Sequence, residues 1–225
     1  MGFDAWNERN PWSLWGQPIV DLESGLQRGA EFLLRPASGQ LPTELLRDAA
    51  RAGYLSNLEE AIVRRALQTQ VPGLRFINVT LPSLLRINLD MDLTGTVLEL
   101  TEQHQADPDL VRVLRRLRRN GALFALDDVA SGWGRIAGLI DWRPEYVKLD
   151  WPLIHGVDRD PMRQTVVRAM IQLSQDLDST VIAEGIETPE EMVYLQEQGV
   201  PLGQGFLLGS PAPLDEREVA HAACC

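Results

Sequence analysis

Short apolar runs alternate with amphipathic helical patterns along almost the whole 225-residue chain. Apolar runs of four to eight residues bounded by turn residues are typical of buried strands. Strands are predicted at residues 15–20, 30–34, 75–79, 95–100, 122–126, 146–149, 180–183 and 203–207. Helices are predicted between them, at residues 45–53, 57–68, 108–119, 161–177 and 189–198. Repeated strand–helix units indicate an α/β protein, either a closed (β/α)8 barrel or an open doubly wound sheet, and eight strands favour the barrel.

The starts of three helices are marked by a capping residue followed by proline, at Asp107-Pro108, Asp160-Pro161 and Thr188-Pro189. Proline suits the first helical position because its missing N–H has no partner there in any case. Thr188 and Glu191 also have the spacing of a capping box. These signals support the alternation of strands and helices.

No composition shift or linker divides the sequence, so we expect one domain over residues 1–225, with its core at about 13–215. No apolar run is long enough to cross a bilayer, and the first ten residues do not resemble a signal peptide. Cys224 and Cys225 are adjacent and cannot staple the fold. We therefore expect a soluble, cytoplasmic protein that does not associate with membranes.

The formal net charge of -11 disfavours binding of a nucleic-acid polymer through its phosphates. The arginine-rich segment 112–119 is better explained as a solvated helix face, because Leu110, Leu114 and Leu117 recur among the arginines at helical spacing. If the substrate is a phosphate ester, metal ions have to mediate its binding.

Polar side chains with ligand chemistry gather near the ends of the predicted strands. In a barrel these ends form the mouth where active sites lie. The residues concerned are Glu31, Asn78, Glu99, Glu102, Asp127, Asp128, Lys148, Asp150, Glu184 and Glu187.

The adjacent carboxylates Asp127 and Asp128 repel each other unless cations neutralise them, so we interpret them as metal ligands. Oxygen ligands without a His or Cys cluster favour Mg²⁺ or Mn²⁺ over zinc, and such sites suit displacement at phosphorus. Any single carboxylate after a strand is about equally well explained as a helix cap or a solvated charge. Lys148 lies between apolar neighbours, so we expect its ammonium to meet the carboxylates or their bound water.

Other candidate sites are weaker. His104, His155 and His221 have no ligand spacing, and the segment GQGFLLG lacks the spacing of a dinucleotide-binding loop. An aromatic cluster lies near the N-terminus, at Trp6, Trp12 and Trp15; packing is its first interpretation and a partner surface the second.

The ordered motifs QPIVD, EFLLR, FINVT, ELTE, DD, VKLD, AEGIET and QGF resemble those of the EAL domains, which hydrolyse the second messenger cyclic di-GMP. The resemblance runs from Gln17 to Pro211. It implies a modified TIM-like (β/α)8 barrel whose first strand is antiparallel to the others. It also implies a phosphodiesterase that uses two Mg²⁺ or Mn²⁺ ions and releases linear pGpG.

The resemblance also implies roles for individual residues. The implied metal ligands are Glu31, Asn78, Glu99, Asp127, Asp128 and Glu184. Lys148 would position the attacking water, Glu184 would serve as general base, and Glu102 would steady the loop after Asp128. The implied substrate contacts are Gln17, Arg35, Asp150, Glu187 and Gln204.

The sequence departs from the family pattern at several positions. Phe32 replaces the usual alanine, and we expect it to point away from Glu31, toward the helices. The loop 129–132 has one glycine fewer than usual, Pro36 replaces a common aromatic residue, and Trp151 replaces a common basic one. These changes bear on regulation, rate and substrate affinity.

Two alternatives to the enzyme remain open at this stage. One is a catalytically silent receptor for cyclic di-GMP, and the other is a protein-interaction module built on the same barrel. By family analogy the apolar segment after Asp128, around Ile136, Leu139 and Ile140, would form a homodimer surface, and packing of a barrel helix explains it at least equally well.

Overall fold

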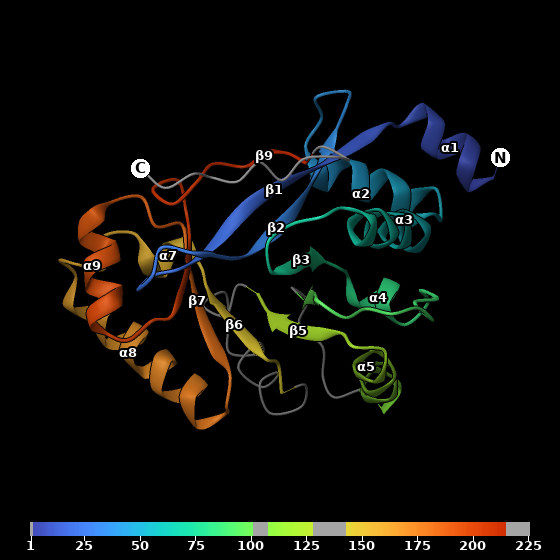
Figure 1. The fold of residues 1–225 in the computed structure, drawn as a ribbon. Helices are drawn as coiled ribbons and strands as arrows, with labels where there is room; N and C mark the ends of the chain where they lie inside the picture. Colours follow the sequence, from blue (N-terminus) through green and yellow to red (C-terminus); the bar gives the residue numbers. More distant parts are fainter. Residues whose placement is uncertain (1, 101–107, 128–142, 215–225) are drawn as a thin grey trace.

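A computed structural model of the protein describes residues 2–100, 108–127 and 143–214. The strands of this part of the chain form one sheet in the order β2-β3-β4-β5-β6-β7-β8-β1-β9, and β1 also pairs with β2, which closes a barrel of eight strands (Figure 1). Their bounds are β1 Trp12–Asp21, β2 Gln27–Pro36, β3 Leu74–Asn78, β4 Thr96–Leu100, β5 Leu123–Leu126, β6 Tyr146–Leu149, β7 Thr180–Glu184, β8 Leu202–Gln204 and β9 Ala212–Pro213.

Strand β1 is antiparallel to both of its barrel neighbours, β2 and β8, while β2 to β8 are parallel to one another. The hairpin β1–β2 runs in register from Trp12 opposite Pro36 to Val20 opposite Gln27. The short strand β9 pairs with Trp15 and Gly16 of β1. The antiparallel first strand implied by the resemblance is therefore confirmed.

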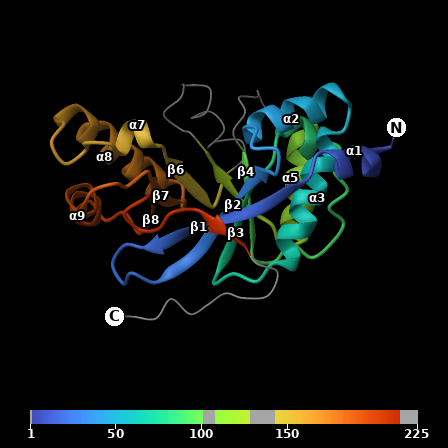
Figure 2. The same cartoon turned by 90° about the horizontal axis from the view of Figure 1, so that it is seen from above.

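Helices lie on the outside of the barrel, along two of its sides (Figure 2). Their bounds are α1 Phe3–Arg9, α2 Pro42–Arg51, α3 Leu55–Gln68, α4 Leu81–Leu84, α5 Pro108–Arg119, α7 Trp151–Ile154, α8 Pro161–Asp176 and α9 Pro189–Glu197. On α5 the leucines at 110, 114 and 117 are buried, as the helical spacing predicts. Arg112, Arg115 and Arg119 are exposed, whereas Arg116 and Arg118 are half-buried. Among the described residues no helix combines the length and hydropathy needed to span a bilayer.

Two of the predicted helix starts lie in the described residues and are confirmed. The Asp160 side chain accepts hydrogen bonds from the N–H groups of Met162 and Arg163. Thr188 and Glu191 form the expected capping box at the start of α9. These caps satisfy helix N–H groups that have no partner within the helix.

The predicted strand at 203–207 is wrong in its second half. Strand β8 ends at Gln204, and the chain then folds back, with the Leu207 N–H donating to the carbonyl of Ile186 and that of Leu208 to Gly205. The apolar residues Phe206 and Leu207 extended the sequence pattern, but both side chains are exposed. The helices α1, α4 and α7 and the strand β9 were not predicted, because elements of two to seven residues carry little periodicity.

The N-terminal aromatic residues pack against the barrel's outer helices. The rings of Phe3, Trp6 and Tyr54 lie 6.0 to 6.3 Å apart between centroids, which docks α1 near the start of α3. The indole N–H of Trp12 donates to the Asn7 side chain at 2.8 Å. The structure supports the packing interpretation of this cluster.

Candidate metal centre and substrate pocket

The barrel interior contains two layers of side chains that come from the same strands. The layer near the amino ends of the parallel strands is apolar and comprises Ile19, Phe76, Val97, Ala125 and Ile182. Side chains two residues apart share one face of a strand, so the next inward positions lie one layer closer to the mouth. Those positions are Gln17, Asn78, Glu99, Asp127 and Glu184. Together with Glu31 and Lys148 they form the upper layer, and the apolar residues form the lower layer.

Strand β6 contributes Lys148 to the upper layer, and its ammonium lies among four carboxylates. Its Nζ atom is 2.6 Å from Glu99 Oε1 and 2.7 Å from Glu184 Oε1. The same atom is 3.6 Å from Glu31 Oε2 and 3.7 Å from Asp127 Oδ1. The Lys148 side chain is 1% exposed, so these carboxylates replace its hydration shell. The prediction that Lys148 meets the carboxylates is confirmed.

The carboxylates of this layer outnumber its single ammonium, and their pKa values reflect that imbalance. Burial raises the pKa of Glu184 to about 8 and raises that of Glu99 above its ordinary value, although Lys148 opposes both shifts. Burial disfavours the ammonium of Lys148, but the carboxylates, Glu184 first, raise its pKa overall. The layer contains the Lys148 cation, but this single positive charge does not balance its four carboxylates.

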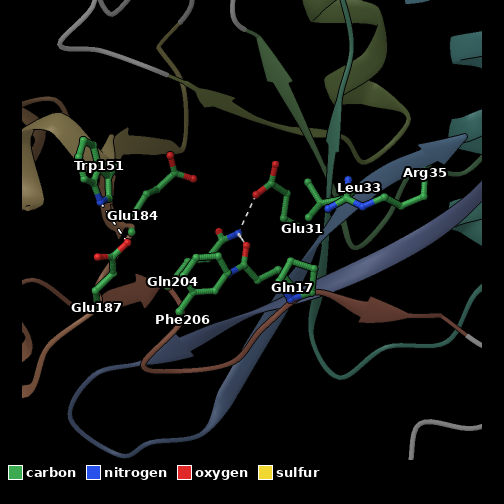
Figure 3. A pocket seen from close by; sticks show the side chains of 12 residues that line it. Gln17, Glu31, Leu33, Arg35, Trp151, Glu184, Glu187, Gln204 and Phe206 are labelled. Carbon is green, nitrogen blue, oxygen red and sulfur yellow. Dashed lines mark hydrogen bonds between the residues drawn. The ribbon is translucent and has the colours of Figure 1, made fainter. Parts of the chain in front are cut away.

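Glu31, from β2, has a lowered pKa. Burial would raise it, but the charge of Lys148 and hydrogen bonds to the carboxylate prevail. Asn78 Nδ2 donates to Glu31 Oε1 at 2.9 Å, and Gln204 Nε2 donates to Glu31 Oε2 at 2.7 Å. Gln204 Nε2 also donates to Gln17 Oε1 at 2.9 Å (Figure 3). Two amides, from β3 and β8, therefore fix the orientation of the Glu31 carboxylate.

A cavity of about 330 Å³ opens above this layer, and Gln17, Glu31, Glu184 and Gln204 line it. Arg35 lines it too; its guanidinium carbon lies 5.7 Å from the centroid of the Trp15 ring. Figure 3 shows that carboxylates and amides from separate strands converge on this space.

Aromatic side chains form part of the cavity wall. Trp151, the first residue of α7, donates its indole N–H to Glu187 Oε1 at 3.2 Å, and Phe206 follows β8 (Figure 3). In the sequence, Trp151 stands out only as a departure from the family pattern and Phe206 only as part of the QGF motif. Their positions next to Asp150 and Gln204 at strand ends were the available signal.

The donor atoms in the upper layer suit a hard divalent cation. They are carboxylate oxygens together with the amide of Asn78. Glu99 is fully buried, and its Oε2 atom has no hydrogen-bond partner within the described part of the chain. Across the same residues no three His, Cys, Asp or Glu side chains are grouped as metal ligands, and the Lys148 ammonium lies between the carboxylates. The oxygen ligands of the upper layer fit a divalent metal ion. In this arrangement the Lys148 ammonium partly neutralises the carboxylates.

The structure brings together most of the residues singled out in the sequence. Glu31, Asn78, Glu99, Asp127, Lys148 and Glu184 meet in one layer, and Gln17, Arg35, Glu187 and Gln204 line the cavity. Asp150 is buried at the N-terminus of α7 and does not line this cavity. Phe32 is buried among core residues, as its position beside Glu31 predicts. Outside the described residues lie Glu102, Asp128, the loop 129–132, the segment 136–140, His104, His221 and both cysteines.

Comparison with known families gives a match to the EAL domain model over residues 5–211. The chain belongs to the EAL domain family. The resemblance drawn from the ordered motifs is therefore confirmed. In this EAL domain the motif glutamate Glu31 contributes to the upper layer, and Phe32 packs outward against the core.

Curated relatives of this EAL domain include two from bacteria. It is 27% identical over 220 residues to the Probable cyclic di-GMP phosphodiesterase PdeG of Escherichia coli, covering 87% of this chain and 43% of that protein. It is 31% identical over 219 residues to the Cyclic di-GMP phosphodiesterase PA2567 of Pseudomonas aeruginosa, covering 87% of this chain and 37% of that protein. The chain thus spans less than half the length of either relative.

Solved EAL structures share the fold. The manganese and cyclic di-GMP complex of Klebsiella pneumoniae BlrP1 superposes with a TM-score of 0.79 at 27% identity, covering 90% of this chain and 56% of that one. The modified TIM-like barrel predicted from the sequence is confirmed by this likeness and by the closed sheet.

Proposed function

We propose that this EAL domain hydrolyses cyclic di-GMP to linear pGpG in a reaction that depends on Mg²⁺ or Mn²⁺. The observation that carries the proposal is the upper layer itself, where Lys148 lies among four carboxylates at the base of a cavity. An excess of buried carboxylates is costly unless cations neutralise it. Cyclic di-GMP brings two phosphodiesters, which need the same cations. The names of the relatives and of the BlrP1 complex support this substrate.

The residues proposed to hold two ions are Glu31, Asn78, Glu99, Asp127, Asp128 and Glu184. Bound ions would neutralise the phosphate and lower the pKa of an attacking water. The orphaned Oε2 atom of Glu99 and the raised pKa values of Glu99 and Glu184 support this assignment, since each marks a carboxylate that lacks sufficient positive charge.

The protein's own groups then handle the proton. Glu184 accepts a proton from the water whose oxygen attacks phosphorus. The Lys148 ammonium, 2.7 Å from Glu184, orients this water and stabilises the negative charge that develops on it. The bond from phosphorus to the ribose O3′ breaks, and the departing oxygen takes up a proton. One water is consumed and one linear dinucleotide with a 5′-phosphate forms.

The cavity wall supplies the proposed substrate contacts. Gln17 and Gln204 are linked by a hydrogen bond and present amide groups, while Arg35 offers a cation at the rim for a phosphate. Glu187, on the cavity wall, is proposed to accept hydrogen bonds from the substrate, and so is Asp150, which lies outside the wall at the N-terminus of α7. Glu102 is proposed to steady the loop after Asp128. A single domain, a homodimer through the segment after Asp128 and a cytoplasmic location also remain predictions.

Turnover tests the proposal. Purified protein is incubated with cyclic di-GMP and Mg²⁺ or Mn²⁺, and the products are separated by chromatography. We expect pGpG, and we expect its loss with a chelator, with Glu31→Ala and with Lys148→Met. Met162→Ala, an exposed change on α8 away from the cavity, serves as the matched control and should keep full activity.

The outcome also separates the alternatives. Tight binding of cyclic di-GMP without turnover would contradict the proposal and favour the receptor. Absence of binding in calorimetry, even with Mn²⁺ present, would leave the interaction module.

A further inference from the structure

Two aromatic side chains in the described residues are exposed, and both line the cavity above the upper layer. Trp151 is 47% exposed and Phe206 67%, whereas the other described phenylalanine, tyrosine and tryptophan side chains are at least partly buried. Leaving a large aromatic surface in water gains nothing for folding, so exposure at a pocket points to use by a ligand. Trp151 is the more constrained of the two.

Local contacts hold the Trp151 ring in one orientation. Its indole N–H donates to Glu187 Oε1 at 3.2 Å, which fixes the outer edge of the ring (Figure 3). Gly185, after β7, lies against the same pyrrole side of the ring: a Cβ there would be only 2.6 Å from Trp151 Cδ1. Gly185 also has a φ of +71°, which other residues rarely adopt, so this close approach depends on glycine.

His155 supports the ring from a second direction. The imidazole stacks on the Trp151 ring with centroids 4.7 Å apart and an interplanar angle of 18°. Nδ1 of His155 lies 3.6 Å from Oε1 of Glu191, a buried carboxylate. His155 therefore lies between the exposed ring and a buried carboxylate.

Glu191 is itself held in place by backbone hydrogen bonds. It accepts from the N–H groups of Gly156 at 2.8 Å, Glu187 at 2.9 Å and Thr188 at 3.1 Å. These bonds tie the end of α7 to the start of α9. The support beneath Trp151 thus belongs to the rigid frame of the barrel.

We propose that Trp151 is a substrate-binding residue that stacks on a purine base of the cyclic dinucleotide, and that His155 is the positioning residue that holds its ring. The inference deepens the proposed function and rests on it. A ring already fixed by Glu187, Gly185 and His155 loses little conformational freedom when a base stacks on it, so the contact favours affinity. A stacked base also remains in place while phosphorus reacts, so the contact acts on KM.

Steady-state kinetics with cyclic di-GMP test the assignment. Base stacking on an aromatic side chain is worth on the order of ten-fold or more in affinity, so Trp151→Leu should raise KM by about ten-fold or more and leave kcat within about two-fold. Trp151→Phe retains a ring and should stay within about three-fold of the parent KM. An unchanged KM for Trp151→Leu, or a loss confined to kcat, would overturn the proposal.

The role of His155 has its own test. His155→Ala should raise KM by a few-fold at constant kcat, and His155→Phe, which preserves the stack, should restore the parent value. If His155→Phe behaves like His155→Ala, the stack does not position Trp151 and this part of the proposal fails. Met162→Ala is the control, with no expected change in either constant.

Failure of this inference differs from failure of the proposed function. A parent protein that does not turn over cyclic di-GMP contradicts the proposed function. A parent protein that does so, with a KM that Trp151→Leu leaves unchanged, contradicts only the proposal that Trp151 stacks on a base of the substrate.

Discussion

Ile182 and Glu184 are two residues apart on β7, and both occupy the barrel interior in different surroundings. Ile182 belongs to the apolar lower layer with Phe76 and Val97, whereas Glu184 lies 2.7 Å from the Lys148 ammonium in the polar upper layer. The same contrast recurs on β3, where Phe76 precedes Asn78, and on β4, where Val97 precedes Glu99.

The comparison separates stability from function along each strand. A buried apolar layer stabilises the barrel by removing hydrocarbon from water. A buried layer of like charges opposes folding unless something compensates it. A chain that retains the second layer does so for its chemistry, and changes in the two layers should have different consequences.

The largest effect is expected from Lys148→Met. This change removes the cation among four carboxylates, so we expect activity to fall by roughly 10²- to 10³-fold, because the group that orients the water and stabilises the developing charge is lost. The free energy of unfolding of the metal-free protein should fall by about 3–5 kcal/mol at pH 8, because the carboxylates lose their partner. Turnover assays and urea denaturation with a chelator measure the two effects. Unaltered stability would show that the ammonium does not compensate the layer.

Phe76→Ala should produce the opposite pattern. Removing this fully buried ring from the lower layer leaves a cavity and should lower the free energy of unfolding by about 3–5 kcal/mol. The kcat of the folded protein should change little, since the upper layer keeps its donors. Denaturation curves and initial rates at low temperature measure both quantities. A large loss of kcat at full folding would mean that the layers are not separable.

The pH dependence of stability should sharpen the comparison. In the metal-free protein the pKa of Glu184 is raised from 4.5 to about 8, and that of Glu99 is raised as well. Between pH 4.5 and about 8 the folded state binds more protons than the unfolded chain. The free energy of unfolding should therefore fall as the pH rises through this range. Saturating Mg²⁺ should weaken this slope, because bound ions favour ionised carboxylates. Denaturant midpoints across the pH range test the sign, and a midpoint that rises with pH would contradict it.

A smaller effect is expected from Gln204→Met at the edge of the upper layer. The substitution removes the amide that donates to Glu31 and Gln17, at 2.7 and 2.9 Å. We expect a loss of about 1–2 kcal/mol in unfolding free energy and a raised KM. Urea denaturation and steady-state kinetics provide the values. A variant with the parent stability and KM would show that the orientation of Glu31 does not depend on this bond.

The periodic features of the sequence predicted the barrel and much of the site. The strands β3 to β7 and the helix caps at Asp160 and Thr188 are where the patterns placed them. The convergence of Glu99, Asp127, Lys148 and Glu184 also followed from the rule that strand ends meet at one mouth.

Features set by tertiary contacts were not predictable in the same way. The antiparallel direction of β1 came only from the family resemblance, since strand direction leaves no mark on local periodicity. The fold-back after Gln204 depends on hydrogen bonds to Ile186, which lies on another strand's loop. The supported position of Trp151 depends on Gly185 and His155, whose proximity the sequence does not display.

Calorimetric titration of metal-free protein with Mn²⁺ tests the central claim that the upper layer exists to hold divalent cations. Repeating the titration in buffers of different ionisation enthalpy counts released protons. We predict saturable binding with proton release at pH 7, because ions displace protons from carboxylates such as Glu184, and strongly weakened binding in Glu99→Gln. Absence of binding, or binding that Glu99→Gln leaves intact, would contradict the account.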